Sequence, residues 1–132
     1  MKKIFTVLVL LCATLVASAQ DVPSSFPRKY LIEHFTGDQC GYCPYGMYSI
    51  MEYSANTTTP CIWVSHHYGF NNDEYTIPES AKIGSTCGVQ GAPNMAMNRT
   101  KIMGTAIAFH PGYLTEDGMA ETIADKCDTT AE

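Results

Sequence analysis

Cys40-Gly41-Tyr42-Cys43 is the sequence feature that most narrows what this chain can fold into. Apolar residues at the spacing of one helical face follow it between Pro44 and Ser54, so the motif lies at the start of a predicted helix. Unpaired N–H groups and the helix dipole stabilise a thiolate there, and the second sulfur, nearly one turn further on, can close a small disulfide ring. The pattern predicts that Cys40 attacks and that Cys43 resolves.

Two other roles for this motif stay open, a structural disulfide and half of a zinc site. Zinc needs two more ligands, but the sequence has no second cysteine pair at this spacing and no histidine pair at a ligand spacing. His66 and His67 are adjacent, so in a strand they point to opposite faces. Redox chemistry is therefore the favoured interpretation, and we expect no metal and no other cofactor.

The N-terminus predicts an export signal. Two lysines precede an apolar run from Ile4 to Val16, and Ala17-Ser18-Ala19 offers small residues for cleavage before Gln20. The run is short for the alternative, a membrane anchor, and no other stretch is long enough to cross a bilayer. The expected organisation is a signal peptide over 1–19, a flexible lead-in over 20–28 and one domain over 29–132.

Removal of the signal leaves 113 of the 132 residues and changes the formal charge from −5 to −7. An acidic chain of this size suits one domain and argues against nucleic acid as a partner. Five cysteines remain, in a compartment where thiols pair. We expect the protein in the periplasm or cell envelope of a bacterium, secreted or associated with the outer membrane.

Strand and helix patterns alternate along the rest of the chain. Aromatic and branched residues predict a strand from Lys29 to Phe35, and Cys61–Ser65 is an uninterrupted apolar run typical of a buried central strand. The remaining predicted elements are a short helix over Pro78–Ile83, strands over Met95–Met97 and Ile102–Phe109, and a helix from Thr115 to Lys126. This order predicts an α/β fold with one mixed sheet flanked by helices.

Two segments resemble the thioredoxin superfamily. Leu31–Cys43 looks like its first strand and active-site turn, and Gly88–Asn94 looks like its loop with a cis-proline before the next strand. More closely, Glu33-His34-Phe35-Thr36-Gly37 followed by the cysteine motif and Pro44 is similar to the bacterial family related to a 28-kilodalton outer-membrane protein. The resemblance covers about residues 29–127 and implies a thioredoxin-like fold.

The resemblance implies Cys40 as nucleophile, Cys43 as resolving thiol and Pro93 as the cis-proline. That proline keeps metal from the thiols and leaves the Ala92 main chain available to pair with an extended substrate segment. His34 stands where thioredoxins keep a buried acid, so it is a candidate proton shuttle, although a half-buried strand residue is an equal alternative.

The other cysteines are interpreted through the same fold. Cys61 begins a strand at the sheet end away from the active site, and the last helix carries Cys127 to that end, which makes these two the candidate disulfide. Cys87 precedes the proline loop and lies out of bonding range of both. It is either a buried small apolar residue or a third redox thiol.

The sequence thus predicts an exported thiol-disulfide oxidoreductase that acts on protein thiols, protein disulfides or extended polypeptide segments. The alternative is a cell-envelope binding module in which the motif is a structural disulfide and the fold is a scaffold. Five aromatic residues are candidates for an apolar rim around the thiols: Tyr42, Tyr45, Tyr68, Phe70 and Tyr75.

Overall fold

The computed structural model describes residues 27–70 and 73–129. The predicted signal peptide and all but the last two residues of the lead-in lie outside these ranges. Within the described ranges, no helix is both long and apolar enough to cross a membrane.

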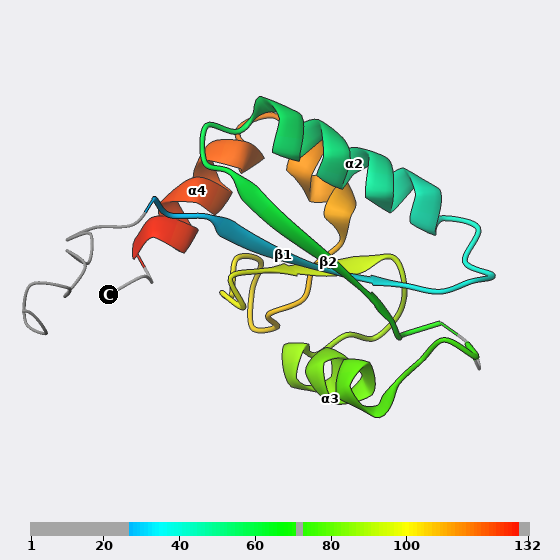
Figure 1. The fold of residues 1–132 in the computed structure, drawn as a ribbon. Coiled ribbons are helices and arrows are strands. Elements are labelled where there is room, and N and C mark those ends of the chain that lie inside the picture. Colours follow the sequence, from blue (N-terminus) through cyan, green and yellow to red (C-terminus); the bar gives the residue numbers. More distant parts are fainter. Residues whose placement is uncertain (1–26, 71–72, 130–132) are drawn as a thin grey trace, which may run out of the picture.

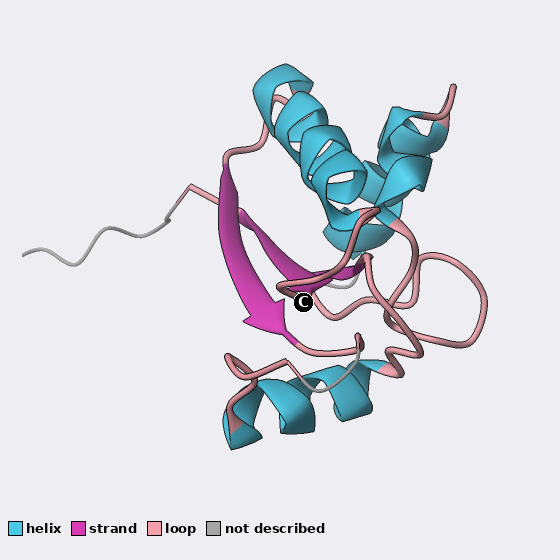
Figure 2. Cartoon of the chain, turned by 90° about the vertical axis from the view of Figure 1, so that its right-hand side faces the viewer, coloured by secondary structure: helices cyan, strands magenta, loops and turns pink. Residues whose placement is uncertain are grey.

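Three layers make up the described fold, with a sheet between two groups of helices (Figures 1 and 2). The sheet contains three strands in the order β2-β1-β3. Helix α2 lies on one face with η1 and α4, and α3 lies on the other face. In chain order the elements are β1 (Tyr30–Thr36), α2 (Cys43–Asn56), β2 (Cys61–His67), α3 (Pro78–Cys87), β3 (Asn94–Met97), the 3₁₀ helix η1 (Pro111–Thr115) and α4 (Met119–Thr129). The predicted α/β fold with a mixed sheet is confirmed.

Strand β1 is the centre of the sheet because it pairs with both neighbours, parallel to β2 and antiparallel to β3. Its side chains alternate between two cores, as the period of a strand requires. Tyr30 and Ile32 pack with residues of α2, η1 and α4, whereas Phe35 packs with Cys87 and Val89 on the α3 side. The turn that carries the cysteine motif therefore follows a strand that is buried on both faces.

The prediction that Cys61–Ser65 forms a buried central strand is wrong. β2 pairs only with β1 among the described strands, so it is an edge strand there. Ile62 is 48% exposed and Val64 is 41% exposed, because α3 covers only the His66 end of their face. An apolar run is compatible with both an edge strand and a central strand. Only the pairing with neighbouring strands distinguishes these two positions.

Two element boundaries near the C-terminus also differ from the prediction. The predicted strand over Ile102–Phe109 is reduced to a single bridge between Phe109 and Met95, because Gly104 adopts a left-handed conformation with φ +77°. The predicted helix from Thr115 begins only at Met119, as α4, because Thr115 ends η1 and Gly118 is left-handed at φ +75°. Glycines at positive φ interrupt both regular elements.

Candidate active site

The cysteine motif forms a tight turn that runs into α2. Cys40 donates its main-chain N–H to Gly37 O at 3.3 Å, and Cys43 donates to Cys40 O at 3.1 Å. The helix begins at Cys43, with Pro44 in its first turn, where a missing N–H costs nothing. Cys40 and Cys43 form a disulfide with their Cα atoms 5.4 Å apart. Both cysteines are buried, Cys40 with 6% and Cys43 with 2% of the residue surface exposed.

The loop before β3 lies beside this turn. The register pairs Asn94 with Phe35 near the end of β1, so Pro93 stands close to where the chain leaves β1 for the cysteines. The Ala92–Pro93 peptide bond is cis, as the resemblance implied. Ala92 is partly exposed, and its main chain makes no hydrogen bond within the described residues. It is an open main-chain edge on the loop before β3.

A groove of about 610 Å³ runs between the cysteine turn and this loop. Its walls come from three segments that are far apart in sequence. The lining residues are Tyr42, Tyr45, Gly91, Ala92, Pro93, Asn94 and His110. The structure thus brings the predicted Ala92 and Pro93 together with two of the five predicted rim aromatics, Tyr42 and Tyr45.

Gly46 allows α2 to approach the proline loop, and the sequence analysis did not single it out. A Cβ atom at this position would lie 2.7 Å from Pro93 Cβ and 2.8 Å from Pro111 Cγ, closer than real Cβ contacts. A glycine inside a helix normally costs about 1 kcal/mol relative to alanine, so its presence here has a packing reason. The glycine sets the distance between the cysteine helix and Pro93.

Gly46→Ala is therefore expected to destabilise the fold, although alanine is the better helix former. Overpacking costs about 1–3 kcal/mol, and the helix propensity offsets about 1 kcal/mol of that. Urea unfolding of the oxidised proteins measures the change. Gly41→Ala is the control, because a Cβ at Gly41 meets nothing within 4 Å. Equal stabilities of the two variants would contradict a packing role for Gly46.

His34 is fully buried on the face of β1 that α2 covers. Neither ring nitrogen has a hydrogen-bond partner within the described residues, and the ring lies edge-on to Trp63 with centroids 6.0 Å apart. The alternative of a half-buried ring is therefore wrong. Burial lowers the pKa of His34 to about 4, with a smaller effect of the His67 charge. The proton shuttle stays a prediction, and a base this weak does not favour it.

Burial of neutral His34 predicts a loss of stability in mild acid. The unfolded chain takes up a proton near the ordinary pKa of 6.5, whereas the folded protein resists until about pH 4. Folding is therefore most favourable above pH 6.5 and weakens as the pH falls, by about 2 kcal/mol at pH 5. Urea unfolding at pH 7 and pH 5 measures this change. His34→Leu should flatten it, and an unchanged slope in that variant would assign the effect elsewhere.

An ion pair between a buried carboxylate and a half-exposed arginine lies on the opposite face of β1. Glu33, 3% exposed, accepts hydrogen bonds from Arg99 Nε at 2.8 Å and Nη2 at 2.7 Å. His66 Nε2 lies 3.5 Å from Glu33 Oε1, and His66 Nδ1 lies 3.1 Å from Ser80 Oγ on α3. The Arg99 hydrogen bonds keep the pKa of Glu33 below its ordinary value despite burial. These contacts connect β1, β2, the turn after β3 and α3.

The segment between β2 and α3 contacts the residues that precede the cysteines. Asp73, which is buried, accepts hydrogen bonds through Oδ2 from the main-chain N–H of Asp38, at 3.0 Å, and pairs with His67 Nδ1 at 2.6 Å. The segment between β2 and α3 is therefore held against the turn that leads to the cysteines.

Cys61 and Cys87 are thiols in the structure. Cys61 and Cys127 contact the same core cluster, at the sheet end away from the Cys40–Cys43 disulfide. Their pairing as a disulfide stays a prediction. Cys87 is 1% exposed in the second cluster, and burial raises its pKa, which agrees with a small apolar residue and not with a reactive thiol.

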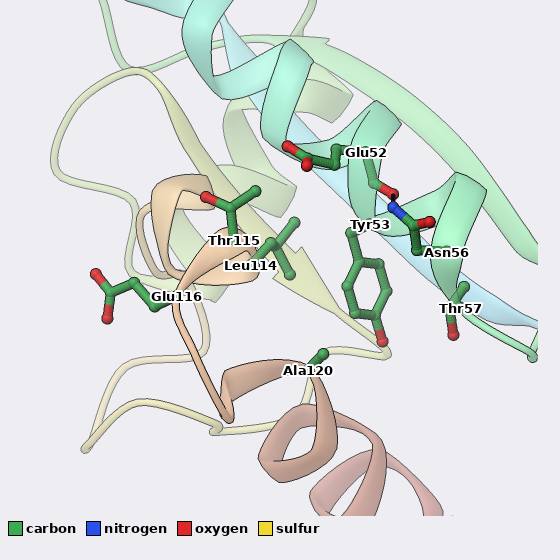
Figure 3. A pocket seen from close by; sticks show the side chains of 8 residues that line it. All are labelled: Glu52, Tyr53, Asn56, Thr57, Leu114, Thr115, Glu116 and Ala120. Carbon is green, nitrogen blue, oxygen red and sulfur yellow. Dashed lines mark hydrogen bonds between the residues drawn. The ribbon is translucent and has the colours of Figure 1, made fainter.

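A second cavity, of about 210 Å³, lies between the C-terminal half of α2 and the segment of η1 and α4. Figure 3 shows Glu52, Tyr53 and Asn56 of α2 facing Leu114 and Thr115 across it. It shares no lining residue with the groove beside the disulfide. It is therefore separate from the candidate active site.

Comparison with solved structures finds HBP35 of Porphyromonas gingivalis, with a TM-score of 0.56 and 22% sequence identity. The match covers 77% of this chain and 35% of that one, so this chain spans about a third of HBP35. The likeness shows the fold, which is thioredoxin-like. No family model matches the chain, and no curated protein does either.

Proposed function

We propose that this chain is an exported thiol-disulfide oxidoreductase that exchanges disulfides with protein substrates through Cys40 and Cys43. The observation that carries the proposal is the position of their disulfide. It lies at the N-terminus of α2, and Tyr42 between the two cysteines lines the same groove as Ala92, whose main chain makes no hydrogen bond within the described part of the chain. A thiolate is stabilised at such a helix end, and an open main-chain edge pairs with an extended polypeptide.

The exchange is reversible and needs only the two reacting pairs. A substrate thiolate attacks Cys40 Sγ, the Cys40–Cys43 bond breaks, and the electron pair leaves on the Cys43 thiolate. A second substrate thiolate then attacks the substrate sulfur of the mixed disulfide and releases Cys40 as a thiolate. The substrate has lost two electrons and the cysteine pair has gained them. Reduction of a substrate disulfide follows the same steps in reverse.

The predicted signal peptide and the resemblance to the family related to the 28-kilodalton outer-membrane protein support a place in the bacterial periplasm or cell envelope. Disulfide exchange has substrates in such an oxidising compartment. The expected partners are protein thiols and disulfides in extended or unfolded segments.

A second candidate function is binding without exchange, in which the disulfide is structural. Exposed apolar side chains favour it. On α2 and the residue before it, Tyr42 is 76% exposed, Tyr45 73% and Tyr48 64%, and β2 adds Ile62 and Val64. The α2 tyrosines and the two β2 side chains lie on opposite sides of the sheet, and each group suits contact with another protein.

An exchange assay tests the proposal against this second candidate. Purified chain from Gln20 onward, with a dithiol as reductant, should reduce an interchain protein disulfide faster than the dithiol alone. Precipitation of the released chain gives the rate. A rate equal to that of the dithiol alone, from folded protein, would leave only the binding function.

A further inference from the structure

We infer that a cleft at the start of β1 binds a compact phosphate-bearing anion, a phosphomonoester or a diphosphate, through Lys29 and Lys101. The cleft has a volume of about 650 Å³. Its lining residues are Arg28, Lys29, Asn98, Arg99, Thr100, Lys101 and Cys127. None of these residues lines the groove beside the disulfide, so the inference is independent of the proposed function.

Three segments that are distant in sequence form this cleft. They are the residues just before β1, the turn that follows β3, and the C-terminal part of α4. The antiparallel register pairs Met97 with Ile32, so the turn after β3 lies beside the start of β1. The cysteine turn follows the other end of β1. The cleft and the candidate active site therefore lie at opposite ends of the central strand.

Positive charge is concentrated in the cleft against the composition of the chain. The whole chain has 8 basic and 13 acidic residues and a formal charge of −5. Nevertheless, four basic residues and no acidic residue line the cleft. A concave surface lined by one sign of charge focuses the electric field and attracts ligands of the opposite sign. The ligand that fits this cleft is therefore an anion.

Lys29 and Lys101 supply the net charge of the cleft. Both side chains are exposed, and neither makes an ion pair within the described residues. The two arginines differ, because Arg28 pairs with Asp128 and Arg99 pairs with Glu33. Hydrogen bonds between an ammonium group and a phosphate are of the strong, charge-assisted class. The lysines are thus the two cations that an anion would neutralise.

Arg99 and Asn98 add donors that are already held in place. Arg99 donates to Glu33 through Nε at 2.8 Å and Nη2 at 2.7 Å, which leaves Nη1 without a partner among the described residues. Asn98 Oδ1 accepts a hydrogen bond from the Leu31 N–H at 2.8 Å, so the Nδ2 amino group is left as a donor. Side chains that are fixed before binding lose less entropy when a ligand arrives.

The charge of the rest of the molecule favours a compact anion over an extended one. A nucleic acid or an anionic membrane would also face the acidic remainder of the chain, which repels it. A phosphate group carries about −1.5 to −2 charges and three strong acceptor oxygens. It can therefore pair with both lysines and also accept a hydrogen bond from Arg99 or Asn98, whereas a carboxylate has one charge and two oxygens.

Titration with inorganic pyrophosphate at constant ionic strength tests the inference, with main-chain amide signals followed by NMR. In the chain from Gln20 onward, we expect saturable shifts at Lys29 and across residues 98–101, without shifts in α3. Lys29→Gln and Lys101→Gln should each raise the dissociation constant about 10-fold, as expected for one charged hydrogen bond. Arginine at either position keeps the charge and should retain most of the binding.

Lys82→Gln is the matched control, because Lys82 lies on α3 outside the cleft and its loss changes the net charge equally. It should leave the dissociation constant unchanged. An equal loss of binding in this control would mean that net charge alone attracts the anion, and would overturn the site. Shifts that grow without saturation would overturn it as well.

Vesicles of phosphatidylglycerol distinguish a lipid headgroup from a free phosphate compound. We expect no co-sedimentation of the chain with these vesicles at physiological salt. Co-sedimentation that Lys101→Gln abolishes, together with no saturable binding of pyrophosphate, would overturn the compact ligand.

Discussion

Cys40→Ser is expected to lower the rate of protein-disulfide reduction by more than about 1000-fold, to the rate of the dithiol alone. Serine has no accessible anion at neutral pH and cannot form a mixed disulfide, so both steps of the exchange are lost. Its size is close to that of cysteine, so the fold should persist apart from the lost Cys40–Cys43 bond.

Cys43→Ser should behave differently and thereby assign the two roles. Cys40 can still attack, but no thiol resolves the product, so the variant should accumulate as a mixed disulfide with the substrate, visible by mass spectrometry. Cys61→Ser is the matched control at the far end of the sheet, and it should exchange like the wild type. Accumulation of the adduct in Cys40→Ser instead would reverse the assignment of attacking and resolving cysteine.

Arg99→Met is expected to reduce the free energy of unfolding by about 2 kcal/mol. The substitution keeps the length of the side chain but leaves the Glu33 carboxylate buried without its two hydrogen bonds. A buried polar group that loses its hydrogen-bond partners costs about 1–3 kcal/mol, and here only the Glu33 carboxylate is buried. Urea unfolding at pH 7, with the disulfide intact, measures the loss.

Arg28→Met is the matched control, since Arg28 pairs with Asp128 at the surface and such pairs contribute about 0–1 kcal/mol. The cost of Arg99→Met should also depend on pH. The pKa of Glu33 in the folded protein lies below its ordinary 4.5, so the pair stabilises the fold above pH 4.5. The difference between wild type and variant should shrink as the pH falls through the folded pKa. Equal losses for both arginine variants would contradict the buried pair.

Sequence patterns correctly predicted those helices and strands whose structure follows from the residues of the segment itself. The aromatic and branched residues of Tyr30–Phe35 form β1, and the helical spacing after the cysteines forms α2. Pro78 begins α3 as predicted, but the helix continues past Ile83 to Cys87 and ends where Gly88 adopts φ +75°. Gly84, Ser85 and Thr86 are weak helix formers, and tertiary contacts maintain the helix through them.

Long-range contacts could not be predicted from those patterns. Glu33 and Arg99 are 66 residues apart, and the one local signal was an acid in the middle of an apolar strand, which requires a partner when buried. Gly46 looked like a weak point in a helix until its contact with Pro93 was known. His110 resembled an ordinary loop residue before Pro111, and only the fold brings it to the groove.

Equilibration of the Cys40–Cys43 pair with glutathione redox buffers is the measurement that tests the central claim most directly. Thiol alkylation and mass spectrometry give the fraction reduced at each potential. An exchange pair should titrate as a two-electron couple between about −270 and −120 mV, the range of disulfide oxidoreductases. A pair that stays oxidised below about −300 mV would be a structural disulfide, and that result would contradict the proposed function.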